Sequence, residues 1–141
     1  MEFSQILISA LRTQGHKITK NRSAILQFLS HQDKPSSADD ILAHVQAEHQ
    51  SAHKTTIYRE LFFLLDHNFI KEIEFGDGRK RYEIAINRPH HHHIICVTCG
   101  EVRDIPMKGE LTTQESVIEK ITGYKLTSHM LEFFGVCSRC Q

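Results

Sequence analysis

Apolar side chains recur at helical spacing through the first half of the chain and predict four helices. The first has Leu7 on its apolar face and ends at Gly15, and the second follows Thr19. Ser37 and Asp40 have the spacing of a capping box that opens the third helix. The third and fourth helices are expected from Ala38 to about His49 and from about Thr55 to His67.

The period then changes from helix to strand. Residues 70–75 and 79–84 predict two short strands joined by Gly76-Asp77-Gly78, a strong hairpin turn. Helices followed by a hairpin give the order of a winged helix, in which the last helix before the hairpin enters the major groove of DNA. Residues 87–89 (Asn-Arg-Pro) indicate a hinge. We therefore expect residues 1–86 to form a winged-helix DNA-binding domain.

A second, smaller domain is expected over residues 90–141. Its pattern predicts strands at 94–97 and 101–105, a helix from about 110 to 121, and a strand at 125–134. The predicted fold class is thus α+β, a winged helix followed by a small β-β-α-β domain. A unit of this size buries little surface alone and needs a metal, a partner or both.

Charge is distributed unevenly along a chain whose formal net charge is zero. Residues 1–28 carry four basic and one acidic side chain, whereas residues 89–141 carry five basic and six acidic ones. A basic N-terminal part suits a DNA-binding module. The N-terminus lacks the basic region and uninterrupted apolar run of a signal peptide, and no stretch has the length of a membrane span. We expect a cytoplasmic protein.

Two C-x-x-C pairs, Cys96/Cys99 and Cys137/Cys140, are the strongest chemical feature. Each pair can place two thiolates on one side of a metal, and two pairs complete the tetrahedral cage of structural Zn²⁺. Gly100 allows the tight turn that follows such a pair. Two disulfides are disfavoured in a cytoplasmic chain, and a thioredoxin-like redox motif usually has a single pair at a helix start. We expect structural zinc.

Four consecutive histidines, His90 to His93, precede the first cysteine. Alternate side chains of a strand face the same way, so His91 and His93 lie on one face and His90 and His92 on the other. This arrangement offers two imidazole pairs to two metal sites, although a solvated polar loop is the alternative. Imidazole suits Zn, Fe, Ni or Cu, and added carboxylates favour harder ions. Candidate ligands outside the run are Glu83, Asp104 and the lone His129.

Groups suited to DNA gather at the start of the fourth helix. Hydroxyl, phenol and guanidinium groups stand there beside backbone N–H groups that favour phosphates. A second polar cluster opens the second helix, where it can hold the DNA backbone. The alternative is a polar helix start whose aromatic ring belongs to the core. The candidate DNA-binding residues are Lys17, Thr19, Arg22, Thr55, Thr56, Tyr58 and Arg59.

Ordered motifs across the chain resemble the ferric uptake regulator family. They are TTIYREL at 55–61, GRKRYE at 78–83, HHHHIICxxCGEV at 90–102 and TGYKLTSHxLEFFGVCxxC at 122–140. The match runs from about Leu11 to Cys140. The resemblance implies a homodimer that binds a double-stranded DNA operator and represses metal-uptake or peroxide-defence genes in a metal-dependent manner. It implies no membrane and no small-molecule substrate.

The resemblance also assigns residues to sites. Tyr58 and Arg59 match the DNA-contacting end of the recognition helix. The implied structural zinc ligands are Cys96, Cys99, Cys137 and Cys140, the interdomain sensing ligands are Glu83, His91 and His93, and the ligands of a further site in the dimerisation domain are His90, His92 and His129.

The chain departs from the family pattern at the sensing site. Many iron- and peroxide-sensing members have a histidine just before the capping serine of the third helix, where this chain has Lys34-Pro35-Ser36. The nearest histidine is His31. Either His31 replaces the missing ligand, or that coordination position is open. Zinc-sensing members often add a cysteine near the hinge, and none is found here. The sequence therefore does not distinguish among Fe²⁺, Zn²⁺ and Mn²⁺ as the regulatory ion.

The further site also lacks its expected acid. Thr112 occupies that position, and Glu110 and Glu115 lie on either side of it.

A zinc enzyme and a protein-interaction module are the alternatives to a repressor. A zinc enzyme needs an open metal position and an acid/base carboxylate, and the sequence has neither H-E-x-x-H nor a deaminase signature. We expect no enzymatic activity. The remaining alternative is a zinc-stabilised winged-helix protein-interaction module without metal sensing. We favour the repressor, in which a metal ties Glu83 to His91 and His93 and sets the angle of the DNA-binding modules.

Overall fold

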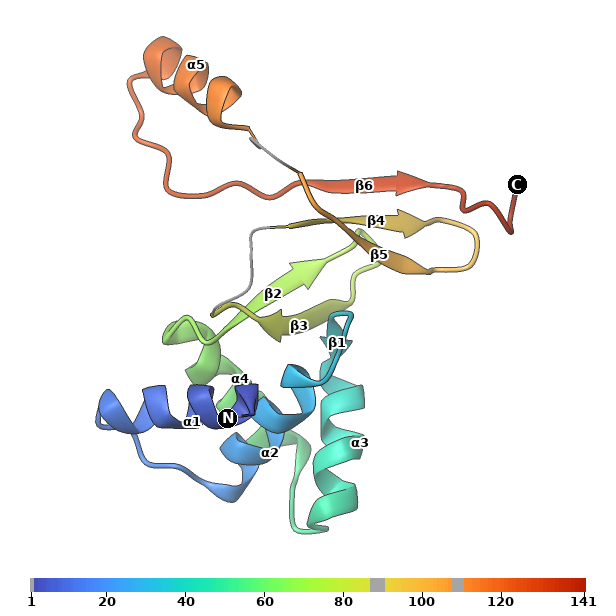
Figure 1. Cartoon of the computed structure of the whole chain (residues 1–141). Coiled ribbons are helices and arrows are strands. Elements are labelled where there is room, and N and C mark those ends of the chain that lie inside the picture. Colours follow the sequence, from blue (N-terminus) through green and yellow to red (C-terminus); the bar gives the residue numbers. More distant parts are fainter. Residues whose placement is uncertain (1, 87–90, 108–110) are drawn as a thin grey trace. The chain divides into compact units, whose positions relative to one another are not determined.

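In the computed structural model the chain divides into two compact units, Met1–Arg88 and Pro89–Gln141 (Figure 1). The structure describes residues 2–86, 91–107 and 111–141. The expected hinge at 87–89, the candidate ligand His90 and the candidate acid Glu110 lie outside these ranges. Each unit contains its own three-stranded sheet. Within the described ranges, the helices are too short or too polar to cross a membrane.

Apart from one short strand, the N-terminal unit has the order of elements that the sequence predicts. Its elements are α1 (Phe3–Thr13), α2 (Lys20–Ser30), β1 (Ser36–Ser37), α3 (Ala38–Glu48), α4 (Lys54–Asp66), β2 (Ile70–Glu74) and β3 (Lys80–Ile84). The hairpin β2–β3 is the wing. The short strand β1 was not predicted, and it pairs antiparallel with β3 through Ser36↔Tyr82 and Ser37↔Arg81.

Side-chain caps fix where α2 and α3 begin. The Thr19 hydroxyl accepts a hydrogen bond from the Arg22 backbone N–H at 3.1 Å. The Ser37 hydroxyl accepts one from the Asp40 backbone N–H at 3.1 Å, and the Asp40 carboxylate accepts one from the Ser37 N–H at 3.2 Å. This reciprocal pair is the predicted capping box, which satisfies donors that the helix itself leaves unpaired.

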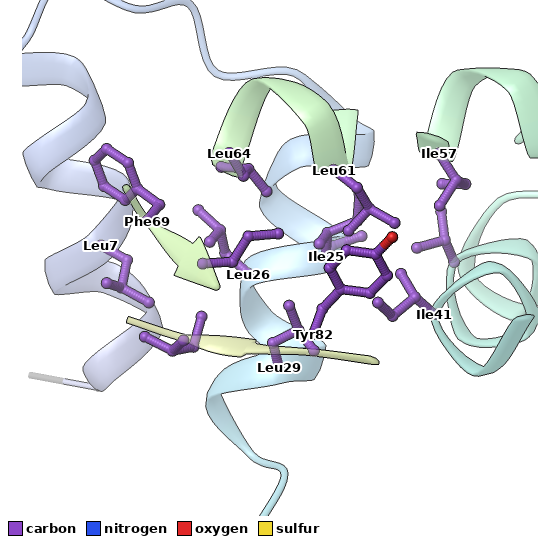
Figure 2. Packing of buried hydrophobic residues seen from close by; sticks show 14 of the residues in the cluster. Leu7, Ile25, Leu26, Leu29, Ile41, Ile57, Leu61, Leu64, Phe69 and Tyr82 are labelled. Carbon is purple, nitrogen blue, oxygen red and sulfur yellow. The ribbon is translucent and has the colours of Figure 1, made fainter. Parts of the chain in front are cut away.

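The hydrophobic core of this unit lies between the helices and the wing (Figure 2). Leu26 and Leu64 are completely buried in it, and the wing contributes Tyr82. The same packing leaves the opposite face of α4 in solvent, where Tyr58 is 44% and Phe62 is 73% exposed. The core therefore presents one face of α4 to a partner.

The C-terminal unit is the predicted β-β-α-β arrangement. It contains β4 (His92–Cys96), β5 (Val102–Ile105), α5 (Thr112–Thr122) and β6 (Glu132–Gly135). β4 lies between the other two strands, antiparallel to β5 and parallel to β6 (Figure 1). The strand predicted over 125–134 is wrong in its first part. β6 pairs with β4 from His93↔Glu132 to Cys96↔Gly135, and among the residues that the structure describes the segment 125–131 joins no sheet.

Helix α5 buries none of its residues within this single chain. It ends at Gly123, whose φ of 74° lies in the left-handed region that favours glycine at a helix end. The Glu119 carboxylate accepts a hydrogen bond from the Leu126 backbone N–H at 2.8 Å, which ties the helix to the segment that follows it. Apolar side chains on α5, including Ile121 at 79% exposure, remain uncovered.

Removal of the α3 cap provides a test of this fold. We expect Ser37→Ala to lower the free energy of unfolding by about 1 kcal/mol, because the Asp40 backbone N–H loses its side-chain acceptor. Urea denaturation followed by circular dichroism measures the effect, with Ser51→Ala at an exposed turn as the control. Equal transition midpoints for the two variants would show that the cap does not stabilise the unit.

Candidate metal centres and nucleic-acid interface

The four cysteines form one cluster at the end of the C-terminal sheet. Cys96 ends β4 and Cys137 follows β6, and the parallel pairing of these strands brings both C-x-x-C turns together. The ligand sulfur atoms all lie within 4.8 Å of one another, and Cys99 Sγ is 3.8 Å from Cys137 Sγ. Sulfur atoms bound to one Zn²⁺ at roughly 2.3 Å stand about 3.8 Å apart in a tetrahedron. The cluster therefore fits Zn²⁺.

The acidity of the thiols supports the same fit. Hydrogen bonds from the backbone N–H groups of Cys137 and Cys99 lower the pKa of Cys96 to about 6. The neighbouring Cys140 thiol lowers the pKa of Cys137, and Cys137 in turn raises the pKa of Cys140 to about 12. The four sulfur atoms are thus too close to ionise together unless a cation compensates their charge. All four are free cysteines, not disulfides.

A second cluster forms on one face of β4. His91 and His93 have their ring centroids 4.9 Å apart, as strand alternation predicted. Asp104 lies on β5 directly opposite His93 in the antiparallel ladder. Its Oδ1 is 3.5 Å from His93 Nε2 and 4.0 Å from His91 Nε2. Two imidazoles and a carboxylate thus converge within this unit. Such a set suits Fe²⁺, Zn²⁺ or Mn²⁺. The sequence named Asp104 as a nearby carboxylate, but did not assign it to the site.

The other ring nitrogen of His93 faces β6. His93 Nδ1 lies 3.2 Å from the Glu132 carboxylate oxygen Oε2. The two residues are direct neighbours in the parallel ladder. Sequence pattern does not single out Glu132, because the register between β4 and β6 depends on a crossover that local pattern does not encode.

The opposite face of β4 carries the described part of the further site. His92 Nδ1 lies 3.2 Å from the Leu131 carbonyl oxygen, and its ring stacks on that of His129 at 5.4 Å between centroids. His129 Nδ1 lies 2.5 Å from Glu115 Oε1. Glu115 is three residues after Thr112 on α5, and residues at this spacing share a helix face. The helix therefore places a carboxylate beside His129 one turn after Thr112.

The candidate ligands in the N-terminal unit, Glu83 and His31, lie in different parts of that unit. Glu83 is on β3, and its carboxylate is 3.0 Å from the Lys71 ammonium across the wing. His31 follows α2, where Nε2 is 2.8 Å from the Glu2 carboxylate and Nδ1 is 2.7 Å from the Gln27 carbonyl. Both His31 nitrogens therefore have partners within this unit, which gives no support to His31 as the replacement ligand.

The start of α4 presents the predicted DNA-binding groups to solvent. Thr55, Tyr58 and Arg59 are exposed and Thr56 is half-buried. His53 occupies the N-cap position without a capping side-chain hydrogen bond, so the first backbone N–H groups of α4 are not capped by that side chain. Lys54 Nζ lies 5.9 Å from the centroid of the Tyr58 ring. A positive, donor-rich helix end of this kind favours phosphate.

Arg22 is placed differently from the other candidate DNA contacts. Its Nε donates to the Glu60 carboxylate at 2.8 Å and its Nη1 donates to the Lys17 carbonyl at 2.6 Å. The guanidinium also lies 3.7 Å from the centroid of the Phe63 ring, and the side chain is only 11% exposed. Arg22 thus joins the start of α2 to α4. Thr19 caps α2, whereas Lys17 is exposed.

Similarity to known proteins places these clusters in a family. The sequence model of the ferric uptake regulator family matches residues 13–134. The chain belongs to the ferric uptake regulator family.

Two similar members of this family illustrate its range. The ferric uptake regulation protein of Campylobacter jejuni is 36% identical over 132 residues, which cover 92% of this chain and 83% of that protein. The peroxide-responsive repressor PerR of Staphylococcus aureus is 33% identical over 134 residues, covering 95% and 88%. Both relatives favour a metal-responsive regulator over a protein-interaction module without metal sensing.

A solved structure supports the same assignment. The ferric uptake regulator of Helicobacter pylori, described as having three functional metal-binding sites, has a TM-score of 0.81 with this chain. The two are 28% identical, and the match covers 99% of this chain and 94% of that one. The winged helix and the four-cysteine unit are thus consistent with the fold of the family.

Loss of one thiolate tests the zinc assignment. We expect Cys140→Ser to lose its tightly bound zinc and to melt at a lower temperature, because a closed site that lacks one ligand no longer stabilises the fold. Elemental analysis and a thermal melt measure both effects, with Ser138→Ala as a control in the same turn. A Cys140→Ser protein with about one zinc per chain and an unchanged melt would contradict the assignment.

Proposed function

We propose that this chain is a homodimeric, metal-responsive repressor that binds operator DNA in the cytoplasm and controls metal-uptake or peroxide-response genes. The convergence of His91, His93 and Asp104 carries this proposal, because it gives a family member a second donor set beside its four-cysteine cluster. A closed thiolate cage suits a permanent structural ion, whereas imidazole and carboxylate ligands suit an exchangeable one. The chain is proposed to have no enzymatic activity.

The Helicobacter pylori regulator, whose structure is described as having three functional metal-binding sites, supports three metal positions in the proposal. The first is the four-cysteine cluster, which would hold Zn²⁺. The second, the sensing site, joins His91, His93 and Asp104 to Glu83 and would take Fe²⁺, Zn²⁺ or Mn²⁺. The third would use His92 and His129 with Glu115, and the sequence adds His90.

Metal would regulate the protein by linking its two units. His91, His93 and Asp104 belong to the C-terminal unit, and Glu83 belongs to the wing. An ion bound by all four residues would join the wing to the C-terminal unit. The ion shifts the protein towards this arrangement only because it binds that arrangement more tightly than the others. The arrangement would set the two α4 helices of a dimer for half-sites one helical turn apart.

The exposed apolar surface of the C-terminal unit supports a homodimer. Ile121, Tyr124 and Met130 are each more than two-thirds exposed, at 79%, 74% and 76%. Phe134 of β6 is 53% exposed. Such a surface in so small a unit is costly in water, and a second copy would bury it. A symmetric dimer would also supply the second DNA-binding unit.

The two faces of β4 give a direct test of metal sensing. We expect His91→Ala to abolish metal-stimulated DNA binding while zinc content and dimerisation are unchanged, because only the sensing face loses a ligand. His92→Ala, on the opposite face, should keep most of the metal response. Fluorescence anisotropy measures the affinity against free Mn²⁺, with a duplex selected from a random pool by the metal-loaded protein.

The two variants also separate the alternatives. Equal loss of response in both variants would contradict the assignment of the two faces to different sites. An undiminished response in both would show that this cluster is not the sensor. Binding of no duplex by the metal-loaded wild type would contradict the repressor itself.

Base contact and backbone contact are distinguishable at the DNA surface. Arg59→Ala should weaken binding to the selected duplex by about 1–3 kcal/mol if the guanidinium reaches bases. Lys17→Ala should weaken binding to every duplex and flatten the dependence of affinity on salt, because fewer counterions are released. Salt titrations of both variants on selected and scrambled duplexes measure the difference. Wild-type affinity in Arg59→Ala would remove Arg59 from the interface.

A further inference from the structure

Strand β6 and the residue just before it supply the hydrogen-bond partners of two successive histidines on β4. The Glu132 carboxylate lies 3.2 Å from His93 Nδ1, and the Leu131 carbonyl lies 3.2 Å from His92 Nδ1. These contacts follow from the parallel register, which sets His93 beside Glu132. Both imidazoles are therefore held through the same ring nitrogen by two consecutive residues at the start of β6, although they face opposite sides of the sheet.

This contact determines what His93 can offer to a metal. A neutral imidazole carries its proton on one nitrogen and its lone pair on the other, and a partner at one nitrogen selects the tautomer. Of the two carboxylates beside the ring, Glu132 is the nearer, at 3.2 Å from Nδ1 against 3.5 Å between Asp104 and Nε2, so it places the proton on Nδ1 and leaves the lone pair on Nε2. His93 Nε2 lies on the Asp104 side, 3.5 Å from Oδ1. The selected tautomer therefore aims its lone pair into the cluster.

We propose that Glu132 is a positioning residue for the sensing site. It accepts a hydrogen bond from His93 Nδ1–H, fixes the ring orientation and strengthens Nε2 as a ligand. Metal-binding histidines in proteins generally rely on such an outer carboxylate or carbonyl, whose loss costs roughly 10- to 100-fold in metal affinity. The role rests on the proposed function in one respect, namely that His91, His93 and Asp104 bind the regulatory ion.

The two faces of β4 differ in the strength of this support. His93 receives an ionisable side chain, whereas His92 receives a backbone carbonyl, which carries only a partial charge. A hydrogen bond to a full negative charge is roughly twice as strong as one between neutral groups. β6 therefore raises the ligand strength of His93 more than that of His92.

The four-cysteine cluster maintains this alignment. Cys96 pairs with Gly135 three positions after His93 pairs with Glu132, and Cys137 follows β6 within two residues. The Cys137 backbone N–H also donates to Cys96 Sγ at 3.3 Å. Zinc bound to both pairs would lock the ladder at this end. Structural zinc thereby keeps Glu132 opposite His93 as well as holding the fold.

The first experiment observes the histidine without a regulatory metal. In zinc-filled wild-type protein, long-range ¹H–¹⁵N NMR should show His93 as the Nδ1–H tautomer, its signals identified by their absence in His93→Gln. In Glu132→Ala we expect a mixture of tautomers, and Glu132→Gln, which retains an acceptor, should recover most of the Nδ1–H form. Glu115→Ala is the matched control, because it removes a carboxylate from His129 instead.

The second experiment measures Mn²⁺ affinity at the site that is lost in His91→Ala. We expect Glu132→Ala to bind Mn²⁺ about 10- to 100-fold more weakly. Glu132→Gln should fall between Ala and wild type, and Glu115→Ala should bind within about twofold of wild type. At saturating Mn²⁺ the Glu132→Ala protein should recover its DNA affinity, because its ligands are intact.

Each outcome decides the role of Glu132. An unchanged tautomer with unchanged Mn²⁺ affinity in Glu132→Ala would overturn the proposal. If Co²⁺ has a lower coordination number in Glu132→Ala than in wild type, Glu132 is itself a metal ligand, and the positioning role is contradicted. If wild-type protein binds no Mn²⁺ that His91→Ala loses, the proposed sensing site fails, while the tautomer measurement still decides whether Glu132 orients His93.

Discussion

The parallel pairing of β4 with β6 is the constraint on which both ends of the C-terminal sheet depend. It brings Cys137 to Cys96 at one end and Glu132 to His93 at the other. The described part of this unit contains little buried apolar surface apart from Ile95, Cys96 and Val102. Hydrophobic packing alone therefore does not fix the pairing. Thiolates drawn to one cation replace the missing core, and ligand geometry follows from that bond.

The N-terminal unit is stabilised in a different way from the C-terminal unit. Its core is extensive, and it holds α4 from beneath while the outer face remains free for a partner. The ion pair of Arg22 with Glu60 adds a polar brace between α2 and α4. One unit thus owes its order to apolar burial and the other to metal coordination. Depletion of metal would loosen the second unit while the first keeps its fold.

Sequence pattern was sufficient where structure is local. The capping box at Ser37, the wing, the two cysteine pairs and the alternation of the histidines all follow from short-range spacing. It was insufficient where contacts depend on the register of distant strands. The contact of Glu132 with His93, the start of β6 and the contact of Glu115 with His129 depend on the crossover through α5. Charge pattern also does not reveal that Glu60 lies beside Arg22, which stays a predicted DNA contact.

The alternating faces of β4 also limit how this segment can change in evolution. Side chains on a strand repeat every two residues, so one residue inserted between His93 and Cys96 would turn every histidine to the other face. Cys96 is held in the four-cysteine cluster, so the strand could not slide along its neighbours to return the histidines to their original faces. The insertion would exchange the donors of two metal positions without altering a single ligand type. Substitutions in this stretch can be gradual, whereas its length is fixed.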